Sequence, residues 1–188
     1  MGFELCRRPR NAAATRSAIL EAASKRFAAE SYDQVGMRDI AGDVGVDPAL
    51  ISRYFGSKED LFMAVLDGCG KGSELMDGDR TELGPRLARE LVYGQRNETK
   101  LDWLLIMLRS ASSPKAAEVL QRSADNFYGP FADWLGGADA KVRSRMIAGL
   151  LMGLTVSRDI SGGFHMTPDE CEAMYRRVGA TLQNLIDG

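Results

Sequence analysis

The sequence has little of what metal proteins and disulfide-stabilised proteins need. It contains one histidine, His165, and three widely spaced cysteines, Cys6, Cys69 and Cys171, with no C-x-x-C pair. A zinc site needs clustered His and Cys ligands, and a disulfide framework needs an even number of cysteines. We therefore expect no metal and no cofactor. A thiol-based sensor is an alternative to cysteines that simply fill apolar space.

Long hydrophobic runs are also missing. The longest uncharged apolar stretch, residues 146–154, is far shorter than the roughly 20 residues that span a bilayer. No apolar run follows the arginines of residues 1–10, which argues against a signal peptide. We therefore expect a cytoplasmic protein with no membrane partner.

Motifs of catalysis are not found either. The sequence has no glycine-rich phosphate loop and no nucleophile elbow, and its single histidine has no partner at a catalytic spacing. Apolar residues make up 45% and charged residues 27% of the 188 residues, which is typical of a folded globular protein and not of a disordered one. We expect a protein that is not an enzyme.

The charge of the chain is unevenly distributed. The net charge is −2, but residues 1–58 hold nine basic against seven acidic residues, which is +2 and leaves −4 for the remainder. The sign of this asymmetry suits an N-terminal segment that binds nucleic acid.

Helical periodicity recurs along the chain, and no alternating strand pattern of useful length is present. The sequence predicts an all-α fold of about nine helices. Glycine, proline and capping residues divide these helices, and the composition of residues 68–84 indicates a connector. The expected helices include residues 15–31, 37–44, 48–55, a fourth from about 57, and two long final helices over about 139–160 and from 168.

The most informative stretch is residues 37–55, where two short helices share a tight turn. Gly45 ends the first helix, and Asp47-Pro48 starts the second with a capping carboxylate and a proline at the first helical position. The pattern predicts a helix-turn-helix over about residues 36–55. The outer face of its second helix carries small or polar side chains that fit a DNA major groove. These side chains are Ala49, Leu50, Ser52, Arg53 and Tyr54.

These residues resemble the DNA-binding domain of the tetracycline-repressor (TetR) family. The resemblance covers about residues 13–73, and 83–188 is then the expected effector-binding and dimerisation domain. The motifs that carry it are Thr15-Arg-x-x-Ile19, Arg38-Asp-Ile-Ala41, Gly45-Val46, Arg53-Tyr-Phe55 and Ser57-Lys-Glu-Asp-Leu61.

The resemblance implies roles for single residues. Arg38, Tyr54 and Lys58 are expected to contact backbone phosphates, and Ala49, Leu50 and Arg53 to face base edges. Many members of the family have Tyr at the position of Ser52 and Ser or Thr at that of Gly36, so those two phosphate contacts are not carried over. Arg10 and its neighbouring arginines either contact DNA as an N-terminal arm or form a solubilising tail.

The resemblance and the symmetry of operators imply a homodimer. We expect its interface on the last two helices. Two sets of residues are candidates: Ala148, Gly149, Leu150, Gly153 and Leu154 on one helix, and Met174, Val178, Leu182 and Leu185 on the other. The alternative is that both stripes belong to the core of the monomer.

Bulky side chains between residues 83 and 131 suggest a pocket for a small-molecule effector, apolar or aromatic with one acidic group. The candidates are Trp103, Met107, Arg109, Phe127 and Phe131, with Tyr128 and Trp134 nearby. Any one of them can equally be a core residue. The sequence thus predicts a ligand-responsive regulator, most simply a repressor, that binds palindromic operator DNA; the alternative is a helical protein-interaction module with a repurposed helix-turn-helix.

Overall fold

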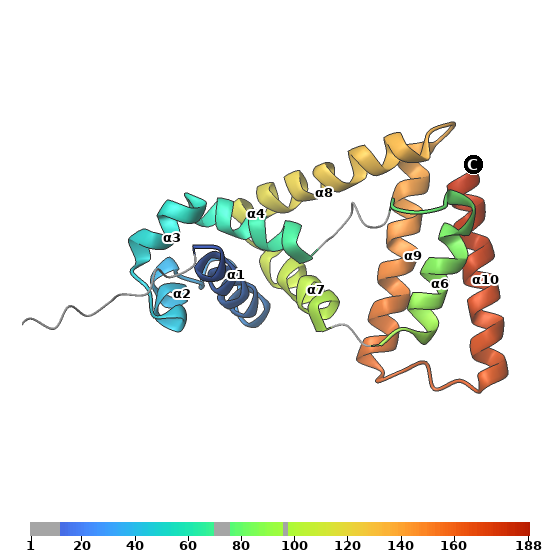
Figure 1. Ribbon diagram of the computed structural model, residues 1–188, viewed down its shortest axis with the longest axis horizontal. Coiled ribbons are helices and arrows are strands. Elements are labelled where there is room, and N and C mark those ends of the chain that lie inside the picture. Colours follow the sequence, from blue (N-terminus) through green and yellow to red (C-terminus); the bar gives the residue numbers. More distant parts are fainter. Residues whose placement is uncertain (1–11, 70–75, 96–97) are drawn as a thin grey trace, which may run out of the picture. The chain divides into compact units, whose positions relative to one another are not determined.

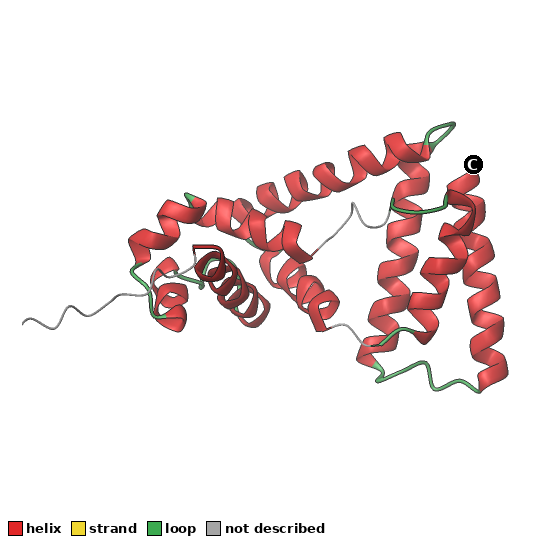
Figure 2. Ribbon diagram, in the orientation of Figure 1, coloured by secondary structure: helices red, strands yellow, loops and turns green. Residues whose placement is uncertain are grey.

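The computed structural model describes residues 12–69, 76–95 and 98–188, and within these ranges every regular element is a helix and the connections are loops and turns (Figures 1 and 2). The predicted all-α class and the count of about nine helices are confirmed within these ranges. The helices are α1 (Ala12–Ala29), α2 (Met37–Val44), α3 (Pro48–Phe55), α4 (Lys58–Cys69), α6 (Leu83–Tyr93), α7 (Glu98–Ser110), α8 (Pro114–Leu135), α9 (Ala140–Ile160) and α10 (Pro168–Asp187), with a 3₁₀ turn η1 (Arg80–Glu82).

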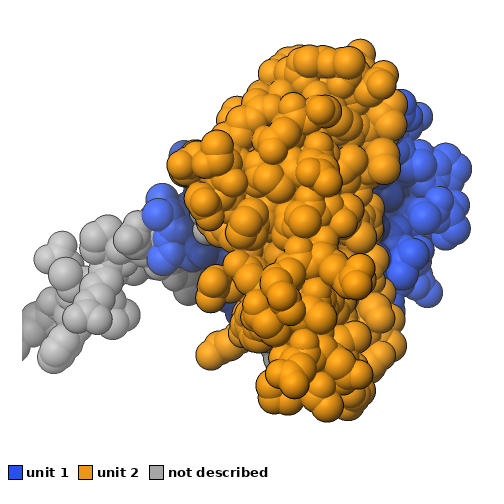
Figure 3. Space-filling view, turned by 90° about the vertical axis from the view of Figure 1, so that its right-hand side faces the viewer, with its two compact units in different colours: residues 1–70, 102–121 blue, residues 71–101, 122–188 orange. Residues whose placement is uncertain are grey.

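The chain forms two compact units that do not follow one another in sequence (Figure 3). Unit 1 comprises residues 1–70 and 102–121, and unit 2 comprises residues 71–101 and 122–188. Helix α8 therefore begins in unit 1 and ends in unit 2. No local sequence pattern signals this division, because it depends on long-range contacts of α7 and α8.

The core of unit 1 explains why α7 and the start of α8 belong with the N-terminal helices. Ile106, Ala116 and Val119 are buried in the same apolar cluster as Phe27 and Phe62 of α1 and α4. Polar contacts accompany this packing. The Arg109 guanidinium donates a hydrogen bond to the Ala29 carbonyl at the end of α1, and the Ser113 hydroxyl donates to the Asp33 carboxylate over 2.9 Å.

The core of unit 2 lies among α6, α9, α10 and the second half of α8. Helices α6 and α10 lie side by side (Figure 1). Their backbones approach closely where Gly84 and Gly179 face the opposite helix. At one end of the unit, Arg80 and Arg143 both donate to the carbonyl of Ile186, which lies in the last turn of α10. These arginines satisfy carbonyls that have no partner within a helix.

Candidate nucleic-acid interface

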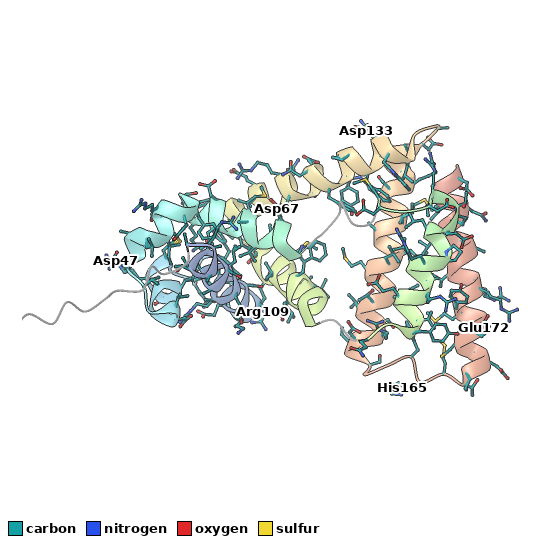
Figure 4. The ribbon with its side chains drawn as sticks, in the orientation of Figure 1. Asp47, Asp67, Arg109, Asp133, His165 and Glu172 are labelled. Carbon is teal, nitrogen blue, oxygen red and sulfur yellow. The ribbon has the colours of Figure 1, made fainter. Side chains whose placement is uncertain are left out.

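The predicted helix-turn-helix is present, and local capping explains its geometry. Gly45 has φ of +70° at the end of α2, and the next N–H donates to the Ala41 carbonyl over 3.0 Å. Asp47 then caps α3, accepting a hydrogen bond of 2.7 Å from the Ala49 N–H (Figure 4). A glycine in the left-handed region followed by an Asp-Pro start makes the turn short.

Burial divides α3 into an inner and an outer face. Ile51 is completely buried in the apolar core of unit 1, whereas Ala49, Ser52 and Arg53 are exposed. Leu50 is half-buried, and Tyr54 is half-buried with its ring packed against the core of unit 1. The outer face is small and polar, which allows a helix to approach base edges in a major groove.

Two further predicted contacts flank α3. Arg38 is exposed in the first turn of α2. Lys58 begins α4, and its ammonium lies 4.3 Å from the centroid of the Tyr32 ring. Burial lowers the pKa of Lys58, while the nearby carboxylates of Asp33 and Glu59 oppose this shift. Because the ring already holds the ammonium by a cation–π contact, Lys58 has a fixed position at the start of α4.

The cations of helices α1 to α4 fall into two groups. Lys25 pairs with Glu21 over 2.7 Å, and Arg26 pairs with Asp43 through bonds of 2.5 and 2.8 Å. No ion pair joins a carboxylate to the cations on or beside the helix-turn-helix in the part of the chain that the structure describes. These cations are Arg16, Arg38, Arg53 and Lys58. Positive charge that is not neutralised within the protein is what phosphate binding requires.

Of the predicted DNA contacts, Arg10 lies outside the described residues. The others, Arg38, Ala49, Leu50, Ser52, Arg53, Tyr54 and Lys58, lie on α2, α3 and the start of α4. Sequence reasoning missed the Arg26–Asp43 pair that ties α1 to α2, because 17 residues separate its members and no local spacing signals such a contact.

The predicted effector residues are divided between the two units. Trp103, Met107 and Arg109 are on α7 in unit 1, whereas Phe127 and Phe131 are on α8 in unit 2. Arg109 (Figure 4) is exposed and already bonded to Ala29. Its role toward a ligand stays a prediction, and the structure gives it a role in packing that the sequence did not reveal.

Aromatic side chains gather on the unit 2 portion of α8. The rings of Phe127 and Phe131 are 5.6 Å apart, and that of Trp134 follows 6.1 Å from Phe131. Two guanidinium groups cover this cluster: Arg80 lies 5.0 Å from the Trp134 ring, and Arg145 lies 4.6 Å from Tyr128. Phe131 is completely buried and Phe127 is half-buried, so the cluster is partly core.

The two helix faces expected to form the dimer interface, one on α9 and one on α10, differ in exposure. Leu182 of α10 is completely buried in the core of unit 2, and Val178 and Leu185 pack against that core. The prediction that Leu182 faces a partner is therefore wrong, because α6 already covers it. On α9, Gly149 and Gly153 are exposed, and the same helix exposes three large apolar side chains: Val142, Met146 and Ile160.

The described residues offer little to a metal ion or a membrane. There, no three or more His, Cys, Asp or Glu side chains gather closely enough to hold a metal ion. His165 is exposed between α9 and α10 (Figure 4), and its ring nitrogen bonds the Ser161 carbonyl over 2.6 Å. None of the described helices is both long and apolar enough to cross a membrane.

Two family models match the chain. Residues 19–65 match the model described as bacterial regulatory proteins of the tetR family, and residues 81–186 match that of the tetracyclin repressor-like C-terminal domain. No curated protein matches the sequence.

Solved structures agree with these matches. A TetR-family regulator from Streptomyces coelicolor A3 is 30% identical to this chain, with a TM-score of 0.56. The match covers 97% of this chain and 99% of the regulator. NalD, the secondary repressor of the MexAB-OprM multidrug efflux pump in Pseudomonas aeruginosa, is 21% identical with coverages of 89% and 96% and a TM-score of 0.66. A regulator from Saccharomonospora viridis in complex with choline is 21% identical with coverages of 91% and 96% and a TM-score of 0.57.

Proposed function

The chain belongs to the TetR family of bacterial transcriptional regulators, and from this premise we propose that it is a dimeric repressor released from operator DNA by a small molecule. Regulators of this family are DNA-binding transcription factors and not enzymes. Its place of action is the cytoplasm, where operator DNA is found.

One observation carries the DNA-binding part of the proposal. Helix α3 buries Ile51 and exposes Arg53 beside the small side chains of Ala49 and Ser52. Among the described residues no carboxylate pairs with this arginine, so the small, polar helix face matches a major groove in shape and charge. Arg53 is the residue that reads a guanine, while Arg38, Tyr54 and Lys58 hold phosphates and fix the register.

The dimer forms through α9 in this proposal. Val142, Met146 and Ile160 are apolar and between 52% and 73% exposed, a cost to a monomer in water that a partner helix removes. Gly149 and Gly153 on the same helix allow the partner backbone to come close. Two-fold symmetry then places two recognition helices on a palindromic operator.

The effector binds in the C-terminal half of the chain, beside the aromatic cluster of Phe127 and Phe131. An apolar or aromatic molecule with one acidic group suits these rings and a nearby guanidinium. The choline-bound relative holds its small molecule within the same fold. Binding shifts α4, which joins the helix-turn-helix to the connector, and so changes the spacing of the recognition helices from the roughly 34–36 Å that one DNA turn requires.

Repression is the mode of regulation that we propose. NalD, a fold relative, is itself a repressor. The second candidate function is a helical protein-interaction module whose helix-turn-helix no longer reads DNA.

Fluorescence anisotropy of a labelled duplex carrying the DNA upstream of this protein's own gene tests the proposal. We expect saturable binding that weakens steeply with salt and that excess mixed-sequence DNA does not abolish. Arg53→Ala is expected to cost about 1–3 kcal/mol of affinity. The matched control Arg122→Ala removes an exposed charge from α8 and leaves binding unchanged.

Two outcomes favour the alternative. One is wild-type binding no tighter than to a random duplex, and the other is an equal effect of Arg53→Ala and Arg122→Ala. An affinity for upstream DNA that no small molecule changes would instead leave a regulator without the proposed effector response.

A further inference from the structure

One cation of unit 1 is held against the recognition helix by an aromatic ring. The guanidinium carbon of Arg16 in α1 lies 4.9 Å from the centroid of the Phe55 ring. Phe55 is the last residue of α3, so the charge of Arg16 lies at the end of the helix that also carries Arg53. A guanidinium stacked on a ring has fewer orientations to lose when it binds an anion.

The charge of Arg16 is also available. Arg16 is exposed, and no ion pair or hydrogen bond ties it to a carboxylate within the described ranges. Lys25, about two and a half helical turns further along α1, is neutralised by Glu21 at 2.7 Å. The same helix therefore has a paired cation away from α3 and an unpaired cation beside it.

A guanidinium is well suited to a phosphate, because it donates two parallel hydrogen bonds to the phosphate oxygens. A purely structural role is the competing explanation, since a cation near the C-terminal end of α3 also favours that helix by its interaction with the helix dipole. The two roles differ in what they change. A phosphate contact alters the salt dependence of DNA binding, whereas a structural role alters only stability.

We propose that Arg16 binds a backbone phosphate of the DNA beside the recognition helix, and that Phe55 positions its guanidinium for this contact. This inference rests on the proposed DNA-binding function and adds α1 to the surface that contacts the duplex. It is a contact that fixes position and affinity without reading sequence.

The test compares the wild type, Arg16→Gln and Lys25→Gln on a labelled mixed-sequence duplex over a series of salt concentrations. Each variant loses one charge from α1 and keeps a residue of similar helix propensity. For Arg16→Gln we expect the slope of log K against log salt to shrink by about 0.9, and affinity near 0.1 M salt to fall about tenfold. The slope of Lys25→Gln stays that of the wild type, and thermal unfolding is recorded for all three proteins.

Three results distinguish a phosphate contact of Arg16 from a structural role, and both from a failure of the proposed operator function. An unchanged slope for Arg16→Gln, with or without a lower Tm, overturns the phosphate contact and leaves a structural role. Equal slope changes for both variants also overturn it, because the effect then follows net charge and not position. A wild type that binds the mixed-sequence duplex normally but shows no preference for the upstream DNA contradicts the operator function alone, while the comparison of variants still decides the role of Arg16.

Discussion

At the scale of single residues, an ion pair between Arg26 and Asp43 joins α1 to α2. Hydrogen bonds from the Arg26 guanidinium hold the pKa of the Asp43 carboxyl below its usual value. A carboxyl whose pKa is lowered in the folded protein contributes stability above its unfolded pKa, and loses it as the pH falls through the folded pKa.

We therefore predict that Asp43→Asn has a lower Tm than the wild type at pH 7. This difference shrinks once the pH drops below about 4, the unfolded value for aspartate, and is lost below the folded pKa. Circular-dichroism melting curves between pH 7 and pH 2 measure it. Asp125→Asn, which changes an exposed carboxylate on α8, serves as the control. A Tm difference that persists at the lowest pH would show that the effect does not come from the charge of Asp43.

Tyr54 combines two functions in one side chain, because its ring packs on the core of unit 1 while the residue remains partly exposed. Tyr54→Phe keeps the ring and removes only the hydroxyl. We expect an unchanged Tm and a loss of DNA affinity of about 1.5 kcal/mol, roughly tenfold, since the lost bond is to a charged phosphate. Anisotropy titrations measure the loss against Tyr128→Phe on α8. If both variants bind like the wild type, the Tyr54 hydroxyl does not contact DNA.

At the scale of elements, the crossing of α6 and α10 depends on the absence of side chains. A Cβ atom on Gly84 would lie 2.6 Å from the Gly179 carbonyl oxygen and 2.7 Å from the Gln183 backbone nitrogen. Backbone atoms cannot move aside as a flexible side chain can, so the two helices must separate.

Gly84→Ala is thus expected to lower the free energy of unfolding by about 1–3 kcal/mol. Gly42→Ala in α2 is the matched control, because a Cβ there meets no atom within 4 Å. It is expected to be neutral or to stabilise by up to about 1 kcal/mol through helix propensity. Urea unfolding measures both, and equal effects of the two substitutions would contradict a tight crossing at Gly84.

The helices that sequence predicted best are those with local end signals. Gly45 and Asp47-Pro48 define the boundaries of α2 and α3, and the observed α2 (Met37–Val44) and α3 (Pro48–Phe55) match the expected ranges. The assignment of α7 and the start of α8 to unit 1 was not predictable. It rests on contacts such as Asp33 with Ser113, 80 residues apart, and no periodicity within a helix reveals its partner.

The difference between local signals and long-range contacts also explains which candidate sites were predictable from sequence. The expected DNA contacts from Arg38 to Lys58 lie on three consecutive elements, so local sequence was sufficient to bring them together. The expected effector residues depend on which helices pack together, and the structure divides them between two units. For Leu182, apolar character alone could not distinguish a face toward α6 from a face toward a second chain.

At the scale of the whole molecule, the proposed dimer depends on the exposed apolar surface of α9. Met146 is 52% exposed in one chain and is expected to be buried by its partner. Met146→Glu then places two carboxylates close to the two-fold axis in an apolar environment, where desolvation and mutual repulsion oppose association. We expect a dimer in the wild type and a folded monomer in the variant, with an affinity for a palindromic duplex lowered by at least about 100-fold because the two heads no longer bind as one.

Analytical ultracentrifugation over a range of protein concentrations gives the mass, and anisotropy gives the affinity. The matched control is Leu108→Glu, which introduces the same charge at an exposed apolar position of α7, where 65% of the leucine is accessible. If the control remains dimeric while Met146→Glu is monomeric and keeps its helical circular-dichroism spectrum, α9 forms the interface. A Met146→Glu protein that remains dimeric would exclude this surface, and it would move the search for the two-fold axis to the exposed face of α10, which carries Arg177, Thr181 and Asn184.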